Sequence, residues 1–222
     1  MYLLFPYNPN VYSVYNILNL ATFQTNLLRY TPLQVIFIYH FRRNKKMSIA
    51  RHPRPPELEG ISIEKIMKTH VARFSERDPD WEAFEDAKIE GYKRAQHRFI
   101  GGGGSGKHTD PKAIPPRAHT LSVMYVQPGQ GNAPHTHEVE ETFFVLQGYL
   151  DAFIEDEEGN RLTTHLGKWD CITCPPGVIH GYDNNSLEPV WFQVMLGRGK
   201  PETMGYADDD LYERRDGHLN SS

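Results

Sequence analysis

The sequence beyond Arg117 alternates between apolar and polar residues, and this pattern restricts the fold more than any other feature. Leu121, Val123 and Tyr125 recur at every second position, which is the side-chain period of a β-strand. Further strands are predicted at 143–146, 149–155, 162–166 and 190–196. Because glycines and prolines separate these short stretches, residues 117–198 are predicted to form a mainly β domain, either a sandwich or a barrel.

The residues on either side of this domain follow other patterns. Residues 47–116 are predicted to form an α-helical N-terminal arm that ends in a Gly/Pro-rich loop. Apolar residues recur at helical spacing from Ile63 to Phe74, and a second helical stretch is expected from Trp81 to Ala95. Residues 199–222 are predicted to be an acidic C-terminal tail.

Charge divides the chain at Met47. Residues 1–46 contain five basic residues and no acidic ones, whereas the remainder carries 19 basic and 28 acidic residues. This acidic body argues against a nucleic-acid partner, which needs a basic surface. Arg29 and Pro32 interrupt the apolar run of residues 1–46, so neither a signal peptide nor a membrane-spanning helix is expected. We expect Met47 to be the native start and residues 1–46 to be an extraneous or disordered extension.

Three potential metal ligands follow one another at even spacing within the β domain. His135, His137 and Glu141 are separated by two and four residues, so on an extended strand their side chains share one face. His180 follows a turn at Gly177 and is a candidate fourth ligand. Three neutral imidazoles and one carboxylate suit Fe(II), Mn(II), Ni(II), Zn(II) or Cu(II). A six-coordinate ion would keep about two positions for water, dioxygen or a chelating substrate.

The same residues resemble the two sequence motifs of the cupins. The first motif, G-x5-H-x-H-x3/4-E-x6-G, is matched at every spacing by Gly129, His135, His137, Glu141 and Gly148. The second motif, G-x5-P-x-G-x2-H-x3-N, is matched by Pro175, Gly177, His180 and Asn184. Its first glycine is displaced, because Trp169 stands at that position and the nearest glycine is Gly167.

This resemblance implies an antiparallel double-stranded β-helix, the jelly-roll barrel of the cupins, with the metal held inside. It also implies a homodimer. Cupin activities include those of dioxygenases, isomerases and decarboxylases, and some cupins only bind small molecules, so the fold does not select the function. We favour an Fe(II)-dependent oxygenase acting on a small organic molecule, with Glu141 or Tyr182 assisting proton transfer. An oxygen-independent isomerase or lyase and a non-catalytic binding protein are the alternatives.

Candidate residues of the substrate pocket follow from strand parity. Gln147 shares the parity of Glu141, and Gln193 is a polar residue in an apolar strand. Arg117 is available to pair with a substrate carboxylate. The other candidates are Tyr125 and Trp191. Plain core packing is the alternative role for the aromatic candidates.

Two further motifs lie in surroundings that disfavour their usual activities. The stretch GGGGSGKH at 101–108 resembles a phosphate-binding loop, but Pro111 and Pro115 prevent the helix that such a loop needs. A flexible loop is predicted instead. Cys171 and Cys174 form C-x-x-C in an extended stretch, where their side chains point to opposite faces, which disfavours a redox role. Without further cysteines there is no disulfide framework, and a cytoplasmic location is expected.

Overall fold

The computed structural model describes residues 52–220, and the chain divides into two units between Glu59 and Gly60. Within the described part of the first unit, Pro56–Leu58 forms the 3₁₀ helix η1. The predicted native start at Met47 and the extension of residues 1–46 lie outside the described residues. In the part of the chain that the structure describes, no helix has the length and apolar character needed to cross a bilayer.

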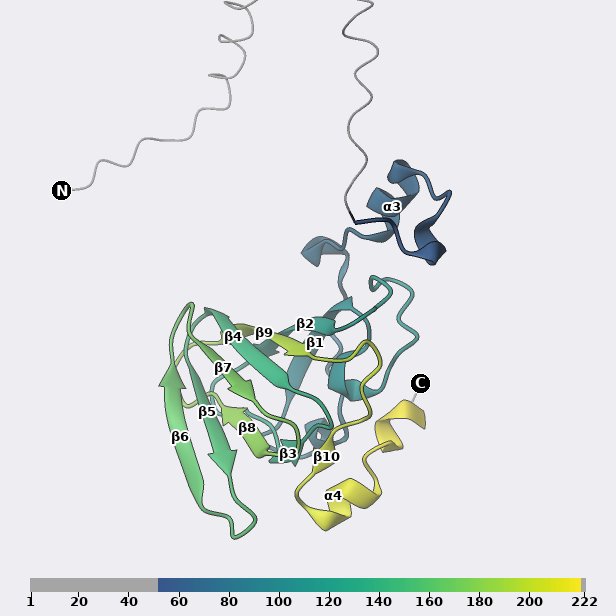
Figure 1. Cartoon of the computed structure of the whole chain (residues 1–222). Helices are drawn as coiled ribbons and strands as arrows, with labels where there is room; N and C mark the ends of the chain where they lie inside the picture. Colours follow the sequence, from purple (N-terminus) through teal and green to yellow (C-terminus); the bar gives the residue numbers. More distant parts are fainter. Residues whose placement is uncertain (1–51, 221–222) are drawn as a thin grey trace, which may run out of the picture. The chain divides into compact units, whose positions relative to one another are not determined.

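The second unit is built on two five-stranded sheets (Figure 1). The first sheet has the order β1-β2-β9-β4-β7 and the second has the order β10-β3-β8-β5-β6, and neighbouring strands are antiparallel. The strands are β1 (Arg94–Ile100), β2 (Thr120–Val126), β3 (His135–Thr136), β4 (Glu141–Gln147), β5 (Leu150–Glu155), β6 (Arg161–Leu166), β7 (Cys171–Cys174), β8 (Ile179–Asp183), β9 (Val190–Leu196) and β10 (Gly205–Tyr206). This architecture confirms the predicted mainly β fold, a double-stranded β-helix.

The core lies between the two sheets and uses alternate residues of each strand. Along β2 the buried positions include Met124 and Val126, and along β4 they include Phe143 and Val145. Phe192 of β9 is fully buried beside them. Each strand turns one face toward the interior, so every second side chain is buried there. Burial of these apolar side chains is the main contribution that stabilises the two sheets against each other.

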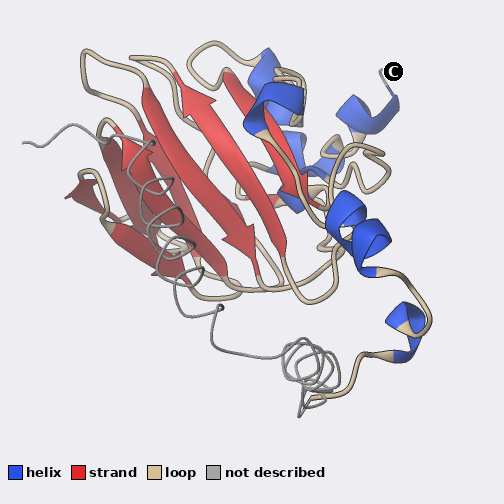
Figure 2. Cartoon of the chain, turned by 90° about the horizontal axis from the view of Figure 1, so that it is seen from above, coloured by secondary structure: helices blue, strands red, loops and turns tan. Residues whose placement is uncertain are grey.

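The helical segments are shorter than predicted. Helix α3 (Ile63–Thr69) begins at Ser62, whose side chain accepts a hydrogen bond from the Lys65 amide at 3.2 Å, and ends before the expected Phe74. The short 3₁₀ helix η2 (Phe74–Glu76) follows. Figure 2 shows that strands make up most of the second unit and that its helices are short.

The second predicted helix, Trp81 to Ala95, is wrong. This segment contains only the 3₁₀ helix η3 (Glu85–Lys88), and β1 begins at Arg94. Arg94 lies opposite Val126 at the edge of β2, and Gly91 has a φ of 90°, which an α-helix does not accommodate. Pairing with a strand edge therefore overrides the helical spacing of the local sequence.

The C-terminal segment, which was predicted to be an acidic tail, is folded as part of the second unit. Strand β10 pairs with β3, and helix α4 (Asp209–Glu213) begins at Asp208, whose carboxylate accepts a hydrogen bond from the Leu211 amide. The 3₁₀ helix η5 (Gly217–Asn220) ends the described chain. Leu211 and His218 are both buried.

The glycine-rich stretch is a packed loop where a flexible one was predicted. It contains the 3₁₀ helix η4 (Gly103–Ser105), and its residues from Gly101 to Ser105 are buried. The Met204 amide donates to the Gly104 carbonyl at 3.2 Å, and His218 Nε2 lies 2.7 Å from the Ser105 carbonyl oxygen. The C-terminal segment therefore fixes this loop in place, and no long helix follows it.

Trp169 explains how the second motif tolerates its displaced glycine. Its φ is 78°, and among the described residues it is the one position other than glycine with a positive φ. The Trp169 amide donates to the Val145 carbonyl at 2.9 Å, which holds the turn against β4. The left-handed conformation costs a residue with a side chain about 1–2 kcal/mol. The turn therefore forms with a tryptophan in a conformation that a glycine would adopt without this strain.

Candidate metal centre

The four candidate ligands come from three strands and one turn of the second unit. His135 lies in β3, His180 lies in β8, and the pairing of these strands sets the two residues opposite each other. Glu141 begins β4, and His137 lies in the turn that leads from β3 to β4. The four side chains converge because strands from two sheets approach one another here, and not because a single strand carries them.

The ligand atoms of these residues form a compact, buried group. One nitrogen or oxygen from each of His135, His137, Glu141 and His180 lies within 4.8 Å of the others. The two carboxylate oxygens of Glu141 lie 2.8 Å from His180 Nε2, 3.5 Å from His135 Nε2 and 3.4 Å from His137 Nε2. All four residues are at most 4% exposed.

Hydrogen bonds at the far side of the rings orient two of the histidines. His180 Nδ1 lies 2.7 Å from the Val178 carbonyl oxygen, which can only accept, so this nitrogen carries the proton and Nε2 is left as the ligand atom. His135 Nδ1 lies 3.0 Å from both Asn132 Nδ2 and the Ala133 carbonyl oxygen. With Nε2 as the ligand atom, Nδ1 carries the proton and donates to the Ala133 carbonyl, while the Asn132 amide packs beside the ring and limits its movement.

Burial and mutual contacts determine the charge state of the cluster. Burial lowers the pKa of His135 to about 4, and its imidazole is therefore neutral at physiological pH. Burial acts to raise the pKa of Glu141, but the close imidazole groups of His137, His135 and His180 outweigh it and hold that pKa well below its usual value. The site thus offers an ionised carboxylate beside at least one neutral imidazole, as a cation requires.

The residues fit a divalent transition-metal ion. Both ring nitrogens of His137 are buried without a hydrogen-bond partner, which is a costly arrangement unless another species pairs with them. Nitrogen and oxygen ligands at about 2.0–2.2 Å from an ion lie up to about 4.4 Å from each other. The observed spread of 4.8 Å is close to that limit.

Comparison with known proteins adds to this geometry. A family model described as "Cupin domain" matches residues 122–196. Residues 122–196 therefore form a cupin domain. This confirms the family that the two motifs indicated.

Individual relatives cover only part of the cupin chain. It is 33% identical over 79 residues to the rhicadhesin receptor of Pisum sativum, covering 33% of this chain and 36% of that protein. It is 35% identical over 71 residues to germin-like protein subfamily 2 member 1 of Arabidopsis thaliana, covering 32% of each. A double-stranded β-helix protein from Klebsiella pneumoniae superposes with a TM-score of 0.37 at 26% identity, over 41% of this chain and 76% of that one. The chain thus spans about a third of the length of its curated relatives.

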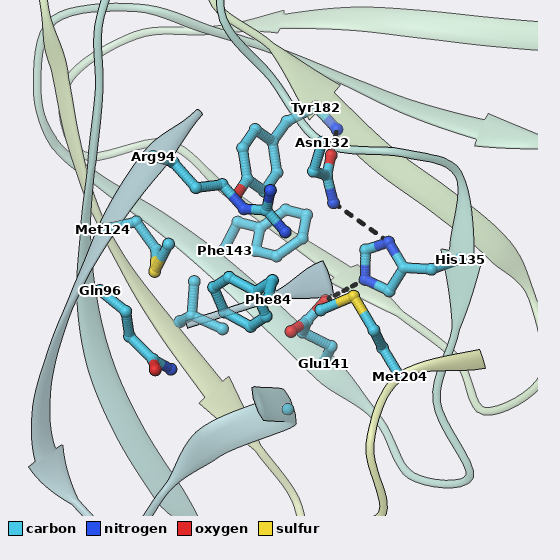
Figure 3. Close-up of a pocket in the computed structure, with 12 residues that line it drawn as sticks. Phe84, Arg94, Gln96, Met124, Asn132, His135, Glu141, Phe143, Tyr182 and Met204 are labelled. Atoms are coloured by element: carbon cyan, nitrogen blue, oxygen red, sulfur yellow. Dashed lines mark hydrogen bonds and ion pairs between the residues drawn. The ribbon is translucent and has the colours of Figure 1, made fainter. Parts of the chain in front are cut away.

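A small pocket adjoins the ligand cluster inside the cupin barrel (Figure 3). Its cavity measures about 20 Å³, which is enough for one water molecule. The apolar lining consists of Phe84, Met124, Phe143, Val194 and Met204. The polar lining consists of Arg94, Gln96, Asn132, Tyr182, His135 and Glu141.

Most of the predicted pocket residues lie elsewhere. Tyr125, Trp191 and Gln193 have the opposite parity from the buried residues of β2 and β9, so they lie on the outer face of the first sheet. Gln147 is exposed at the end of β4, and Arg117 is exposed in the segment before β2. None of these five residues lines the cavity beside the metal ligands.

The outer-face aromatic residues are covered by the segment that precedes β1. The rings of Tyr125 and Trp191 are 4.6 Å apart, the Phe74 ring lies 5.5 Å from that of Trp191, and the Trp81 ring lies 6.0 Å from that of Tyr125. This packing gives the two strand residues an apolar role outside the barrel, which matches the alternative of plain core packing.

Tyr182 is the predicted residue that does line the pocket. It is 3% exposed and packs edge-on against Phe143 and Phe192. Burial raises its pKa well above the usual value, and the nearby Arg94 charge opposes this only in part. The phenol is therefore protonated at neutral pH, and its hydroxyl group is a hydrogen-bond donor rather than a base.

Several pocket residues were missed by sequence reasoning. Arg94 was assigned to a helix that is not present and Gln96 lay just beyond its end, although the apolar and polar alternation of RAQHRFI is a strand signal. Gly104 belongs to the loop at 101–108, and an added Cβ there would lie 2.6 Å from His137 Cε1. Asn132 and Met204 carry no local signal, because only the tertiary fold brings them to the pocket.

The cysteine pair agrees with the sequence interpretation. Both thiols are free. Cys171 is exposed and Cys174 is buried, so the two side chains face opposite sides of β7. Burial, together with the Glu141 charge, raises the pKa of Cys174 to about 12. Such a thiol is protonated at physiological pH, which makes it a poor nucleophile.

Proposed function

We propose that this cupin is a metal-dependent enzyme that oxidises a small organic molecule with dioxygen, with Fe(II) as its ion. The observation that carries the proposal is the complete, buried set of three imidazoles and one carboxylate. His135, His137, Glu141 and His180 would hold the ion. A redox-active ion with open coordination positions supplies the electron transfer that lets dioxygen react with an organic substrate.

The pocket supports a reaction that is shielded from bulk water. Phe84, Met124, Phe143, Val194 and Met204 supply an apolar wall. The cavity of about 20 Å³ leaves room for about one water molecule, so a bound substrate would displace the water it meets. Exclusion of water strengthens the electrostatic contacts within the site and limits side reactions.

Two chain residues have distinct proton roles in this proposal. Glu141 is held ionised by its imidazole neighbours and serves as a ligand. Tyr182 is held protonated by burial, so its hydroxyl group can donate a hydrogen bond to a substrate oxygen. The expected homodimer and the cytoplasmic location remain predictions.

Oxygen consumption tests this proposal. Protein reconstituted anaerobically with Fe(II) would be mixed with a panel of small hydroxy, keto and aromatic acids in an oxygen-electrode cell. We expect substrate-dependent oxygen uptake, its loss in His180→Ala, and its retention in Glu140→Gln, which changes an exposed neighbour of the ligands. Turnover without oxygen would favour a lyase or isomerase, and ligand binding unaffected by metal removal would favour a non-catalytic binding protein.

A further inference from the structure

Two polar residues of β1 face the pocket from the side opposite the metal ligands. Arg94 and Gln96 are two residues apart on the strand, so they project from the same face, and they are 1% and 2% exposed. Figure 3 shows both side chains reaching into the pocket across from Glu141 and His135. Burying an arginine and an amide is costly, which calls for an account of their partners.

The guanidinium of Arg94 is held in place but is not saturated. Its Nη2 lies 3.0 Å from a carboxylate oxygen of Asp86, and its Nη1 donates to the Tyr92 carbonyl at 2.8 Å. Its Cζ lies 4.3 Å from the centre of the Phe84 ring. Its Nε and Nη2 are both buried without a hydrogen bond of regular geometry, and the Tyr182 hydroxyl group lies beside the guanidinium. Donors of the planar group therefore remain available.

The counter-ion of Arg94 is shared among other donors. Asp86 Oδ2 accepts from the Ala133 amide at 2.9 Å, and Asp86 Oδ1 accepts from the Tyr206 hydroxyl at 3.2 Å. Asp86 is fully buried. These bonds fix the carboxylate behind the guanidinium, so the arginine is oriented before any ligand arrives and loses little freedom on binding.

Gln96 has one unpaired atom as well. Its Nε2 donates to the Ser122 hydroxyl at 3.1 Å and to the Gly102 carbonyl at 3.3 Å, and these two acceptors fix the orientation of the amide. Its Oε1 is buried without a hydrogen-bond partner. The same pocket wall therefore presents an unpaired donor at Arg94 and an unpaired acceptor at Gln96.

The charge of the pocket favours an anion. Arg94 and Asp86 neutralise each other, and a divalent ion held by one carboxylate and three neutral imidazoles carries a net charge of about +1. A neutral substrate would leave that charge uncompensated in a dry pocket, whereas a carboxylate would balance it. The guanidinium is also the side chain whose planar geometry matches a carboxylate.

We propose, resting on the proposed function, that the substrate of this site is a small carboxylate whose anionic group pairs with Arg94 and whose hydroxyl or amino group donates to Gln96. Arg94 thus takes the role that was predicted for Arg117. The narrow cavity favours a compact acid, and the flexible side chains of Met124 and Met204 can adjust to it.

Binding of three small probes tests this proposal without turnover. Acetate, its neutral isostere acetamide, and glycolate would be titrated into Zn(II)-loaded and metal-free protein, followed by NMR. We expect acetate to bind about tenfold or more tightly than acetamide in the Zn(II)-loaded protein, because a hydrogen bond to a charged group contributes more than a neutral one. We expect glycolate to bind more tightly than acetate. Equal affinity for acetate and acetamide would overturn the anion site, and equal affinity for acetate and glycolate would overturn the role of Gln96.

A pair of double variants assigns the effect to Arg94. Arg94→Met with Asp86→Asn removes both charges and avoids an unpaired buried carboxylate, and it should abolish the preference for acetate. Arg98→Met with Asp80→Asn removes the other Arg–Asp pair of β1, whose atoms lie 2.5 Å apart away from the pocket, and should leave that preference intact. A preference that survives the first double variant would overturn the proposal.

The outcome is separable from that of the proposed function. A carboxylate preference that depends on Arg94, found together with no oxygen uptake, would support the anion site and reject the oxygenase. Oxygen uptake without any carboxylate preference would support the oxygenase and reject the anion site.

Discussion

The two halves of the pocket differ in how the sequence specifies them. The metal half comes from β3, β4 and β8, and its four ligands lie within the two cupin motifs. The other half comes from Phe84, β1, the glycine-rich loop and the residue Met204, all outside those motifs. The first half can be found by counting residues along the chain, whereas the second exists only after distant segments have packed together. The comparison teaches that a motif locates a reactive centre but not the wall that selects its substrate.

Removing Arg94 should have the largest effect on stability. Arg94→Met leaves Asp86 as a fully buried carboxylate without its ion pair, so we expect the free energy of unfolding to fall by about 3–5 kcal/mol. Urea unfolding followed by circular dichroism measures this loss. Arg98→Met is the matched control, and because its partner Asp80 is partly exposed and also binds Lys107, the loss should be smaller. Equal losses would remove the distinction between the buried pair and its neighbour.

Adding a methyl group at Gly104 should disturb both halves at once. The new Cβ would lie 2.6 Å from His137 Cε1, so we expect Gly104→Ala to cost about 1–3 kcal/mol of stability and to weaken metal binding. Gly197→Ala is the control, because the nearest atom to its added Cβ is the Glu140 carbonyl oxygen at 3.7 Å. Thermal unfolding with and without metal gives both quantities. A Gly104→Ala protein that matched Gly197→Ala would show that the loop does not press on the ligand.

Asn132→Ala tests how the wall supports a ligand. Asn132 contacts His135 Nδ1 at 3.0 Å and accepts a hydrogen bond from the Tyr182 amide at 2.8 Å. Loss of such a supporting contact typically weakens metal affinity by about 10–100-fold. Competition with a chelator measures the affinity, and Asn185→Ala, which alters an exposed contact with Asp151, is the control. Unchanged affinity in Asn132→Ala would mean that the Ala133 carbonyl alone orients the ring.

The outer face of the first sheet should show the smallest effect. Gln193 lies on that face, away from the cavity, so Gln193→Leu should change metal and acetate affinities by less than about twofold. The same chelator competition and NMR titration measure both affinities. A large change would place Gln193 in contact with the site and would blur the division between the two faces.

Much of the fold and the metal half of the site could be predicted from the sequence. The strands of residues 117–198 follow from alternation, and His135, His137, Glu141 and His180 follow from spacing. Glu138 and Glu140, which have the opposite parity from His135, His137 and Glu141, are exposed. These features depend on residues close together in the chain, where the period of a strand fixes the direction of each side chain.

The substrate half could not be predicted for two physical reasons. Strand parity tells which side chains share a face of the sheet, but not which face lies inside the barrel. In β9 the outer face also carries an apolar residue, because Trp191 packs against Phe74 there. The segment before β2 has helical spacing that competes with the strand alternation of residues 94–100, and pairing with β2 decides between them. Arg94 and Gln96 therefore remained hidden until the pairing was known.

The central claim is that four side chains of this cupin hold one divalent transition-metal ion. Elemental analysis of the protein, purified without added metal and again after anaerobic reconstitution with Fe(II), tests it most directly. We predict about one ion per chain in the native sequence and almost none in His135→Ala, with Glu140→Gln retaining its ion. A native chain that carries no transition metal by either route would contradict the account.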